Sequence, residues 1–307
     1  MTVKIVARAD VQDFLKIASN LEGTDGNQRV KQVVHRLLSD LFRAIEELEL
    51  TPDEVWAGVG YLNDLGGRSE AALLAAGLGL EHYLDLRLDA EDEAAGIAPG
   101  TPRTIEGPLY VEGAPVSDGF ARMDVDPDVG DTLFIHGTVT APDGSPVAGA
   151  VVEAWHANSK GFYSHFDPTG AQTPFNLRRA VRTGADGRYE FQTLVPCGYG
   201  CPPDGPTQAL LDELGRHGNR PAHVHLFASA PGHRKLTTQI NIEGDPLVDD
   251  DFAFATREGL VPPIAHVTDG GAKGLSTGYA DITFDLRLTA LTDGEDDQVV
   301  DRRRKQG

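Results

Sequence analysis

The stretch Ala222-His223-Val224-His225-Leu226-Phe227 alternates its side chains with a period of two. This period is typical of a β-strand, in which successive side chains point to opposite faces. Both imidazoles would then share one face, with Cα atoms about 7 Å apart across two strand steps. Two such histidines can chelate one metal ion, although a hydrogen-bonded pair or a surface pair explains these residues equally well.

Further strands are predicted on both sides of this stretch. Runs rich in β-branched residues, separated by Gly, Pro and Asp, indicate strands over residues 132–140, 150–157, 187–194, 222–229, 236–242 and 280–288. Because no helical pattern lies between them, they favour an antiparallel β-sandwich. The connections over residues 158–182 and 195–221 are unusually long, and such loops often carry binding and catalytic groups.

The N-terminal part of the sequence shows helical rather than strand periodicity. Residues 29–47 predict an amphipathic helix with one wide apolar stripe, formed by Val30, Val33, Val34, Leu37, Leu38, Leu41, Phe42 and Ile45. Thr51-Pro52-Asp53-Glu54 predicts a second helix start with a capping box, and a third helix is expected from Ser69, carrying Leu73, Leu74, Leu78 and Leu84. The texture changes near residue 104, so we expect a mainly β protein with α, divided into a helical domain (1–104) and a β-sandwich domain (105–307).

Composition and charge exclude several classes of partner. The 307 residues include 47 acidic and 27 basic ones, a formal net charge of −20 that should repel nucleic acid and anionic membranes. No run approaches the ~20 apolar residues of a membrane span, and no signal peptide is apparent at the start, so a cytoplasmic protein is expected. Cys197 and Cys201 are too few for a disulfide scaffold and are interpreted as buried or loop thiols. The charged tail, residues 293–307, is expected to fray.

Each long loop carries a tyrosine beside glycine. Tyr163 lies in GFYSHFD (161–167) and Tyr199 in PCGYGCP (196–202). Either could be a packed aromatic residue with a satisfied hydroxyl. That interpretation is weaker for Tyr199, because its Gly and Pro neighbours offer accessible backbone rather than core.

Longer motifs make the chain resemble the intradiol catechol dioxygenases, in particular their catechol 1,2-dioxygenase branch. The resemblance covers nearly the whole chain. It is carried by WHANSKGFYSHFD (155–167), FNLRR (175–179), PCGYGCPPDGPTQALLDELGRHGNRPAHVH (196–225), APGHRKLTTQINIEGD (230–245) and DDFAFATREGL (250–260).

The resemblance implies an iron(III) site. The family's ligand positions fall on Tyr163, Tyr199, His223 and His225, with Tyr163 and His223 equatorial and the other two axial. Residue chemistry agrees, because a phenol with a pKa of ~10 ionises near neutrality only beside a strong Lewis acid, and its hard oxygen suits ferric iron. By this analogy, catechol displaces Tyr199 and is opened between its hydroxyl groups by O2, giving cis,cis-muconate in the catabolism of aromatic compounds.

Two further polar residues match positions near the family's iron. Arg220 resembles an arginine that faces the substrate and stabilises developing negative charge, although a loop-capping surface arginine is the plainer interpretation. Gln239 could hydrogen-bond a ligand or bound oxygen, or be an ordinary polar strand residue. His156, His165 and His217 are not at ligand positions and are expected to have structural roles.

The resemblance also predicts the walls of the substrate pocket. Its lining would be Leu73, Ala76, Ile105, Pro108, Leu109, Arg220, Phe252 and Ala253. The apolar members carry no charge for a substrate carboxylate, so catechol fits better than protocatechuate, and the small Ala76 could admit a methyl substituent. Without the resemblance, Leu73, Ile105 and Leu109 would be taken as core residues.

Other classes of function compete with this one. Residues 136–155 and 182–194 resemble prealbumin-like and carboxypeptidase-regulatory β-sandwich modules, which only bind or brace. A module of that kind has no use for the loop tyrosines and the histidine pair together. A zinc hydrolase is a weaker alternative, since no third acidic ligand stands out. Hydroxyquinol or a substituted catechol as preferred substrate, and a homodimer through the N-terminal helices, follow from the family alone.

Overall fold

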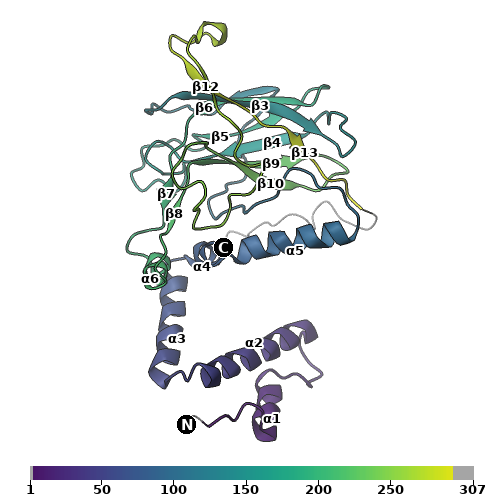
Figure 1. The fold of residues 1–307 in the computed structure, drawn as a ribbon, viewed down its shortest axis with the longest axis vertical. Coiled ribbons are helices and arrows are strands. Elements are labelled where there is room, and N and C mark those ends of the chain that lie inside the picture. The colour runs from purple at the N-terminus through teal and green to yellow at the C-terminus, as the bar shows by residue number, and fades with distance from the viewer. Residues whose placement is uncertain (1–2, 293–307) are drawn as a thin grey trace. The chain divides into compact units, whose positions relative to one another are not determined.

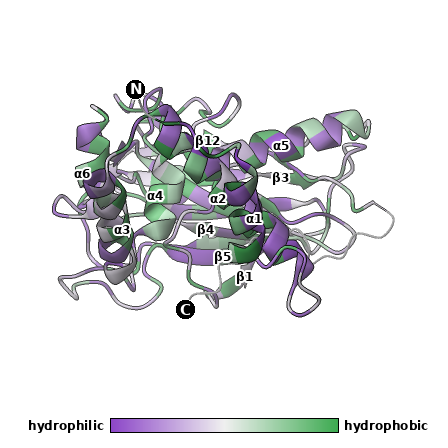
Figure 2. Cartoon of the chain, turned by 90° about the horizontal axis from the view of Figure 1, so that it is seen from below, coloured by the Kyte–Doolittle hydropathy of each residue, from purple (hydrophilic) through white to green (hydrophobic). Residues whose placement is uncertain are grey.

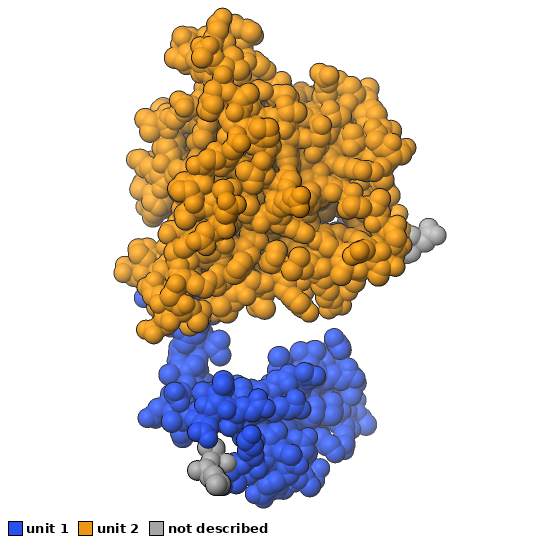
Figure 3. Space-filling view, in the orientation of Figure 1, with its two compact units in different colours: residues 1–68 blue, residues 69–307 orange. Residues whose placement is uncertain are grey.

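The computed structural model describes residues 3–292, so the predicted fraying of residues 293–307 lies outside the described part. Its contacts divide the chain into two compact units, Met1–Arg68 and Ser69–Gly307 (Figure 3). The predicted boundary near residue 104 follows a different criterion, the change from helices to strands. Helices α4 (Ala71–Gly77) and α5 (Leu80–Ala94) lie between the two boundaries and belong to the second unit.

The first unit consists of α1 (Ala9–Ala18), α2 (Gln28–Glu47) and α3 (Pro52–Gly67). The predicted helix over 29–47 is confirmed, and the Asn27 side chain caps it by accepting a hydrogen bond from the Val30 amide. The predicted capping box at Thr51 and Glu54 is also formed. Much of the apolar stripe of α2 remains exposed, at Val30, Val33, Val34, Leu37 and Leu41. None of the described helices is both long and apolar enough to span a membrane.

The single helix predicted from Ser69 is wrong, because two helices occupy that segment. Leu73 and Leu74 lie on α4 and Leu84 lies on α5. Between them Gly79 has a φ of 75°, a left-handed conformation that ends the first helix and redirects the chain. Helix α5 carries hydrophobic and hydrophilic residues along its length (Figure 2).

Ion pairs connect α5 to the sandwich. Asp92 pairs with Arg103 and with Arg234, and Asp89 pairs with Arg257 at 2.6 Å. The three arginines lie in segments that flank strands of the sandwich. The ion pairs therefore attach α5 to the β-sandwich of the second unit.

The second unit contains a β-sandwich (Figure 1). One sheet has the order β1-β5-β4-β9-β10, and the other has the order β11-β12-β3-β6-β2, with β13 also paired to β3. The strands of the first sheet are β1 (Val116–Asp118), β4 (Val151–Trp155), β5 (Arg178–Arg182), β9 (His223–Ser229) and β10 (Leu236–Asn241). Those of the second are β2 (Phe120–Arg122), β3 (Thr132–Thr140), β6 (Arg188–Leu194), β11 (Ala265–Val267), β12 (Tyr279–Thr283) and β13 (Leu286–Arg287).

The six predicted strands are present, with one divided and several short ones missed. Residues 280–288 form two strands, β12 and β13, rather than one. The long connections contain β5, the short pair β7 (Tyr199–Gly200) and β8 (Asn219–Arg220), and α6 (Pro206–Glu213). The sandwich is not purely antiparallel, because β1–β5, β2–β6, β12–β3 and β13–β3 are parallel pairs. A single-turn 3-10 helix covers Gly271–Lys273.

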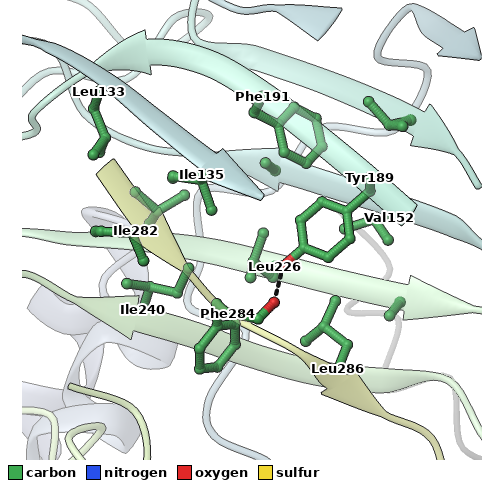
Figure 4. Packing of buried hydrophobic residues seen from close by; sticks show 14 of the residues in the cluster. Leu133, Ile135, Val152, Tyr189, Phe191, Leu226, Ile240, Ile282, Phe284 and Leu286 are labelled. Atoms are coloured by element: carbon green, nitrogen blue, oxygen red, sulfur yellow. Dashed lines mark hydrogen bonds between the residues drawn. The ribbon is translucent and has the colours of Figure 1, made fainter. Parts of the chain in front are cut away.

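The main core lies between the two sheets (Figure 4). Alternate side chains of β3 and β6, such as Leu133, Ile135 and Phe191, meet Leu226 and Ile240 from the facing sheet, and all five are 0% exposed. The Tyr189 hydroxyl, buried among them, donates a hydrogen bond of 2.6 Å to the Phe284 carbonyl. The core is therefore apolar, and the buried hydroxyl of Tyr189 has a hydrogen-bond partner.

Strand β9 is buried on both faces, and this arrangement positions the site. Val224, Leu226 and Ala228 enter the core between the sheets. His223, His225 and Phe227 alternate with them and are at most 2% exposed on the opposite face. The outer face of this sheet therefore carries a second buried region.

Candidate active site

The two histidines of β9 are close enough to share one ion. Their Nε2 atoms lie 3.1 Å apart, and both side chains are 1% exposed. The His223 Nδ1–H donates to the Pro221 carbonyl at 2.6 Å, which leaves Nε2 with its lone pair. Since burial lowers the pKa of His223 to about 3 and that of His225 well below its ordinary value, both imidazoles are neutral at neutral pH.

Both predicted tyrosines reach the same point. The Tyr163 hydroxyl lies 3.4 Å from the Tyr199 hydroxyl and 3.4 Å from His223 Nε2. Tyr163 belongs to the loop after β4 and is 2% exposed, whereas Tyr199 begins β7 and is partly exposed. Burial, followed by the neighbouring Tyr199, raises the pKa of Tyr163 well above its ordinary value. Without a bound cation the phenol is therefore neutral.

Two glycines allow the tyrosine loops to approach this closely. Gly161 has a φ of 80°, and a Cβ on it would lie 2.9 Å from the Tyr199 Cβ. A Cβ on Gly198 would lie 2.5 Å from the Arg220 carbonyl oxygen. A side chain at either position would push the loops apart.

The ring of His225 is oriented mainly by stacking. Trp155 lies directly opposite it on β4, with ring centroids 4.9 Å apart and planes within 7° of parallel. The Nδ1 of His225 has no hydrogen-bond partner among the described residues. The Trp155 indole therefore fixes the orientation of the His225 ring, whose Nε2 points to the other donor atoms.

The four donor atoms suit a metal ion. Ligands about 2.1 Å from one ion, at angles of about 90–110°, lie about 3.0–3.4 Å from one another, close to the separations of the two oxygens and two nitrogens here. In the described part of the chain, no group of three His, Cys, Asp or Glu side chains could hold a metal. Any metal at this place therefore needs the tyrosines, and phenolate with imidazole favours ferric iron over zinc.

Arg220 is held firmly beside these donors. It is 3% exposed, and β7–β8 pairing places it opposite Tyr199. Its Nη1 lies 2.9 Å from His223 Nε2, and its Nη2 donates to Gln239 Oε1 at 2.9 Å. Gln239, on β10, is paired in turn with His225 in the sheet register. The two predicted polar residues thus lie where the donors meet.

Asp251 neutralises Arg220, a role that was not predicted from the sequence. Its Oδ2 lies 3.0 Å from Arg220 Nη2, and both side chains are at most 4% exposed. Burial raises the pKa of Asp251, but the Arg220 charge outweighs it and the pKa lies below its ordinary value. The only signal was an acidic residue in the motif DDFAFATREGL, since the two partners are separated by 31 positions.

A cavity of about 1480 Å³ opens beside the donors. Tyr163 and Tyr199 line it, and so do all eight residues predicted for the pocket: Leu73, Ala76, Ile105, Pro108, Leu109, Arg220, Phe252 and Ala253. The resemblance did not predict the charged side chains that also line the cavity, which are Glu70, Glu106, Glu112, Glu153 and Lys235. It exceeds the about 300–1,000 Å³ of ordinary ligand pockets.

The three other histidines of the motifs lie elsewhere. His156 is 1% exposed and bonded through its two nitrogens to the Ala157 carbonyl and the Thr193 hydroxyl. His165 accepts a hydrogen bond from the Phe175 amide, and His217 pairs with Asp250 at 3.1 Å. Each thus has partners outside the donor set. Cys197 and Cys201 are both free thiols.

Comparison with known proteins identifies relatives over nearly the full chain. The family model described as Dioxygenase matches residues 105–290, and the one described as Catechol dioxygenase N terminus matches residues 27–96. Catechol 1,2-dioxygenase 1 of Acinetobacter lwoffii is 67% identical over 306 residues, covering 99% of this chain and 98% of that protein.

Solved structures agree with these matches. A catechol 1,2-dioxygenase from Acinetobacter sp. ADP1, inhibited by bound mercury, superposes with a TM-score of 0.94 at 61% identity, covering 98% of this chain and 99% of that one. The enzyme from Pseudomonas arvilla C-1 gives a TM-score of 0.91 at 53% identity, covering 95% of each chain.

Proposed function

Since this chain belongs to the intradiol catechol dioxygenase family, we propose that its converging tyrosines and histidines hold the iron with which it opens the catechol ring. The chain is an enzyme that cleaves catechol between its two hydroxyl groups, in the catabolism of aromatic compounds. Molecular oxygen is the co-substrate, and cis,cis-muconate is the product. The non-enzymatic β-sandwich module is set aside, because full-length relatives are enzymes.

The observation that carries the iron assignment is the convergence of Tyr163, Tyr199, His223 and His225. They come from three separate segments, yet consecutive donor atoms lie 3.1–3.4 Å apart. Bound ferric iron would supply a Lewis acid that draws electron density from a chelated catecholate. The neutral imidazoles supply lone pairs, and the two phenols must give up protons to bind.

The two tyrosines differ in the way that their proposed roles require. Tyr163 is enclosed at 2% exposure and surrounded by buried aromatic residues, so it is suited to remain in place. Tyr199 is partly exposed at the cavity wall. With iron bound, Tyr199 would therefore be the more readily released ligand when catechol binds, and its phenolate oxygen would accept the proton of a catechol hydroxyl.

Arg220 supplies a fixed positive charge to the reacting ring. Asp251 and Gln239 hold its guanidinium, so little reorganisation is needed when negative charge develops on the substrate. Ile105, Phe252 and the other apolar wall residues confine the ring without bonding it. The size of the cavity and the small Ala76 support acceptance of a methyl-substituted catechol beside catechol itself.

The exposed stripe of α2 supports a homodimer through the N-terminal helices. Val30, Val33, Val34, Leu37 and Leu41 present apolar surface that a second copy would cover. A monomeric mass at micromolar concentration would contradict this. The free thiols of Cys197 and Cys201 are consistent with a reducing cytoplasm.

The test of the function uses the purified, iron-loaded protein. We expect a visible tyrosinate-to-iron absorption band and conversion of catechol to cis,cis-muconate, followed by its ultraviolet absorbance. A colourless iron-loaded protein would contradict the ligand assignment. A ring-cleavage product bearing an aldehyde would show cleavage outside the hydroxyl pair and contradict the reaction.

A further inference from the structure

Arg178 is a buried cation that lacks an acidic partner. It begins β5 and is 1% exposed, and no carboxylate forms an ion pair with it within residues 3–292. The guanidinium of an arginine remains charged at neutral pH. The other buried arginine of this region, Arg220, is neutralised by Asp251. The two arginines therefore differ in what balances their charge.

An unbalanced buried charge is expensive, so its surroundings should contain what offsets it. Isolated ions cost several kcal/mol to bury even after the protein relaxes. The Cζ of Arg178 lies 5.5 Å from the ring centroid of Tyr163 and 5.9 Å from that of Phe166. Of these two rings only Tyr163 can become an anion. Its phenolate would be the missing counter-charge.

The guanidinium also clamps the loop that carries Tyr163. Its Nε donates to Ser164 Oγ at 2.9 Å, and its Nη2 donates to the Ser164 carbonyl at 3.1 Å. Ser164 Oγ donates in turn to the Asn176 carbonyl at 2.7 Å. Ser164, the residue next to Tyr163, is thus held through both its side chain and its backbone by one planar guanidinium. We call this pair of hydrogen bonds from Arg178 the fork.

The sheet register places Arg178 in line with the donors. Trp155 on β4 lies opposite Arg178 on one side and opposite His225 on the other. Directly opposite residues of neighbouring strands share a face. Arg178, Trp155 and His225 therefore form one row on the face that carries the site.

We propose that Arg178 is a positioning residue for Tyr163, fixing its loop through the fork and placing a permanent positive charge against the phenolate that binds iron. This inference rests on the proposed function. The two contributions are separable, because lysine keeps the charge without the fork, whereas glutamine removes the charge.

The experiment compares iron-loaded wild type with Arg178→Lys and Arg178→Gln. Iron retention is measured by competition with a chelator, and the wavelength of the tyrosinate-to-iron band is recorded on the loaded fraction. Both variants should lose about 10- to 100-fold in retention, the usual cost of removing a group that supports a metal ligand. Only Arg178→Gln should move the band to longer wavelength, because a phenolate without its cation donates electrons more readily.

Arg179→Gln is the matched control. Arg179 is the next residue of β5, points to the opposite face, and donates only to the backbone carbonyls of Phe175 and Arg178 in the described contacts. It should retain iron with the wild-type band. Wild-type retention in Arg178→Gln, or an equal band shift in both Arg178 variants, would overturn the proposal.

Ser164→Ala keeps the test decisive if Arg178→Gln does not fold. It removes one acceptor of the fork and leaves the charge, so retention should fall while the band stays in place. Retention equal to wild type would contradict the clamp. A wild-type protein that binds no coloured iron would instead contradict the proposed function, which distinguishes the two failures.

Discussion

The two faces of β9 are equally buried but are built from opposite materials. Val224, Leu226 and Ala228 are 0% exposed and meet apolar side chains of the facing sheet. His223 and His225 are 1% exposed, and their nitrogens lie among phenols, an arginine and each other. Burial alone therefore does not separate core from site. The stability of the core depends on how completely its volume is filled, whereas the function of the site depends on individual donor atoms. Substitutions on the core face should therefore lower stability, and substitutions on the site face should remove iron or activity.

The largest expected contrast is between His223→Ala and Leu226→Ala. His223→Ala removes a donor atom, so we expect loss of bound iron and no measurable turnover, with a folded protein. Leu226→Ala leaves a cavity and should cost about 2–5 kcal/mol of unfolding free energy while the iron remains. Metal analysis and denaturant unfolding of both variants measure this. Iron loss in Leu226→Ala but not in His223→Ala would reverse the assignment of the two faces.

Arg220→Ala should separate charge from metal binding on the site face. We expect coloured iron to remain and turnover to fall about 10²–10³-fold, the cost typical of losing one preorganised electrostatic group. Because Asp251 would then be a buried, unpaired charge, the variant should also be less stable.

The double variant Arg220→Ala with Asp251→Asn removes that stability problem. The double variant should unfold at a higher denaturant concentration than Arg220→Ala, and its turnover should be as slow as that of Arg220→Ala. Recovery of turnover in the double variant would show that Arg220 acts only through stability.

His156 offers a buried imidazole outside the donor set. Burial lowers its pKa to about 4. An unfolded histidine binds a proton below about 6.5, so the His156 contribution to stability is complete above that pH and declines as pH falls toward 4. The full loss would be about 3 kcal/mol in the iron-free protein. Unfolding free energy measured across this range in His156→Gln should fall less steeply.

His266→Gln is the control for this measurement, since that side chain is exposed. Its stability should follow the wild-type curve. An unchanged pH dependence in His156→Gln would mean that other groups account for the acid sensitivity.

The smallest effect is expected at the cavity wall. Ala76 is 2% exposed beside Phe252 and Ile105, so Ala76→Leu fills space rather than changing charge. We expect turnover of a methyl-substituted catechol to fall about tenfold more than that of catechol. A factor of about ten is the smallest discrimination usually obtained when one methyl group no longer fits an apolar pocket. Steady-state kinetics with both substrates measure the ratio. An equal loss on both would place the methyl group elsewhere in the cavity.

Elements with their own periodicity were predictable, and elements defined by a partner were not. Strand β9 and helix α2 follow directly from periods of two and 3.6 residues. Strand β5, with the sequence RRAVR, carries three arginines and has no such pattern. It is a strand because β4 and β1 pair with it on either side. Helix α6 was likewise hidden in a stretch that suggested only a loop.

The same division applies to the site. The residue types of Tyr163 and His223 suggested metal binding only with the help of the family resemblance, because 60 positions separate them. Asp251 and Arg178 had no signal that set them apart from surface charges. Their burial and partners could be known only once the strands were paired.

By itself, the sequence determined the alternation of β9, the amphipathic pattern of α2, the capping box of α3 and the acidic net charge. Tertiary structure decided which donors meet, which buried arginine has a carboxylate, and that one face of β9 is core and the other is site. The physical reason is the range of the forces involved. Backbone geometry, capping and alternation act over a few residues, whereas burial and charge depend on strand pairings that join residues far apart in the chain.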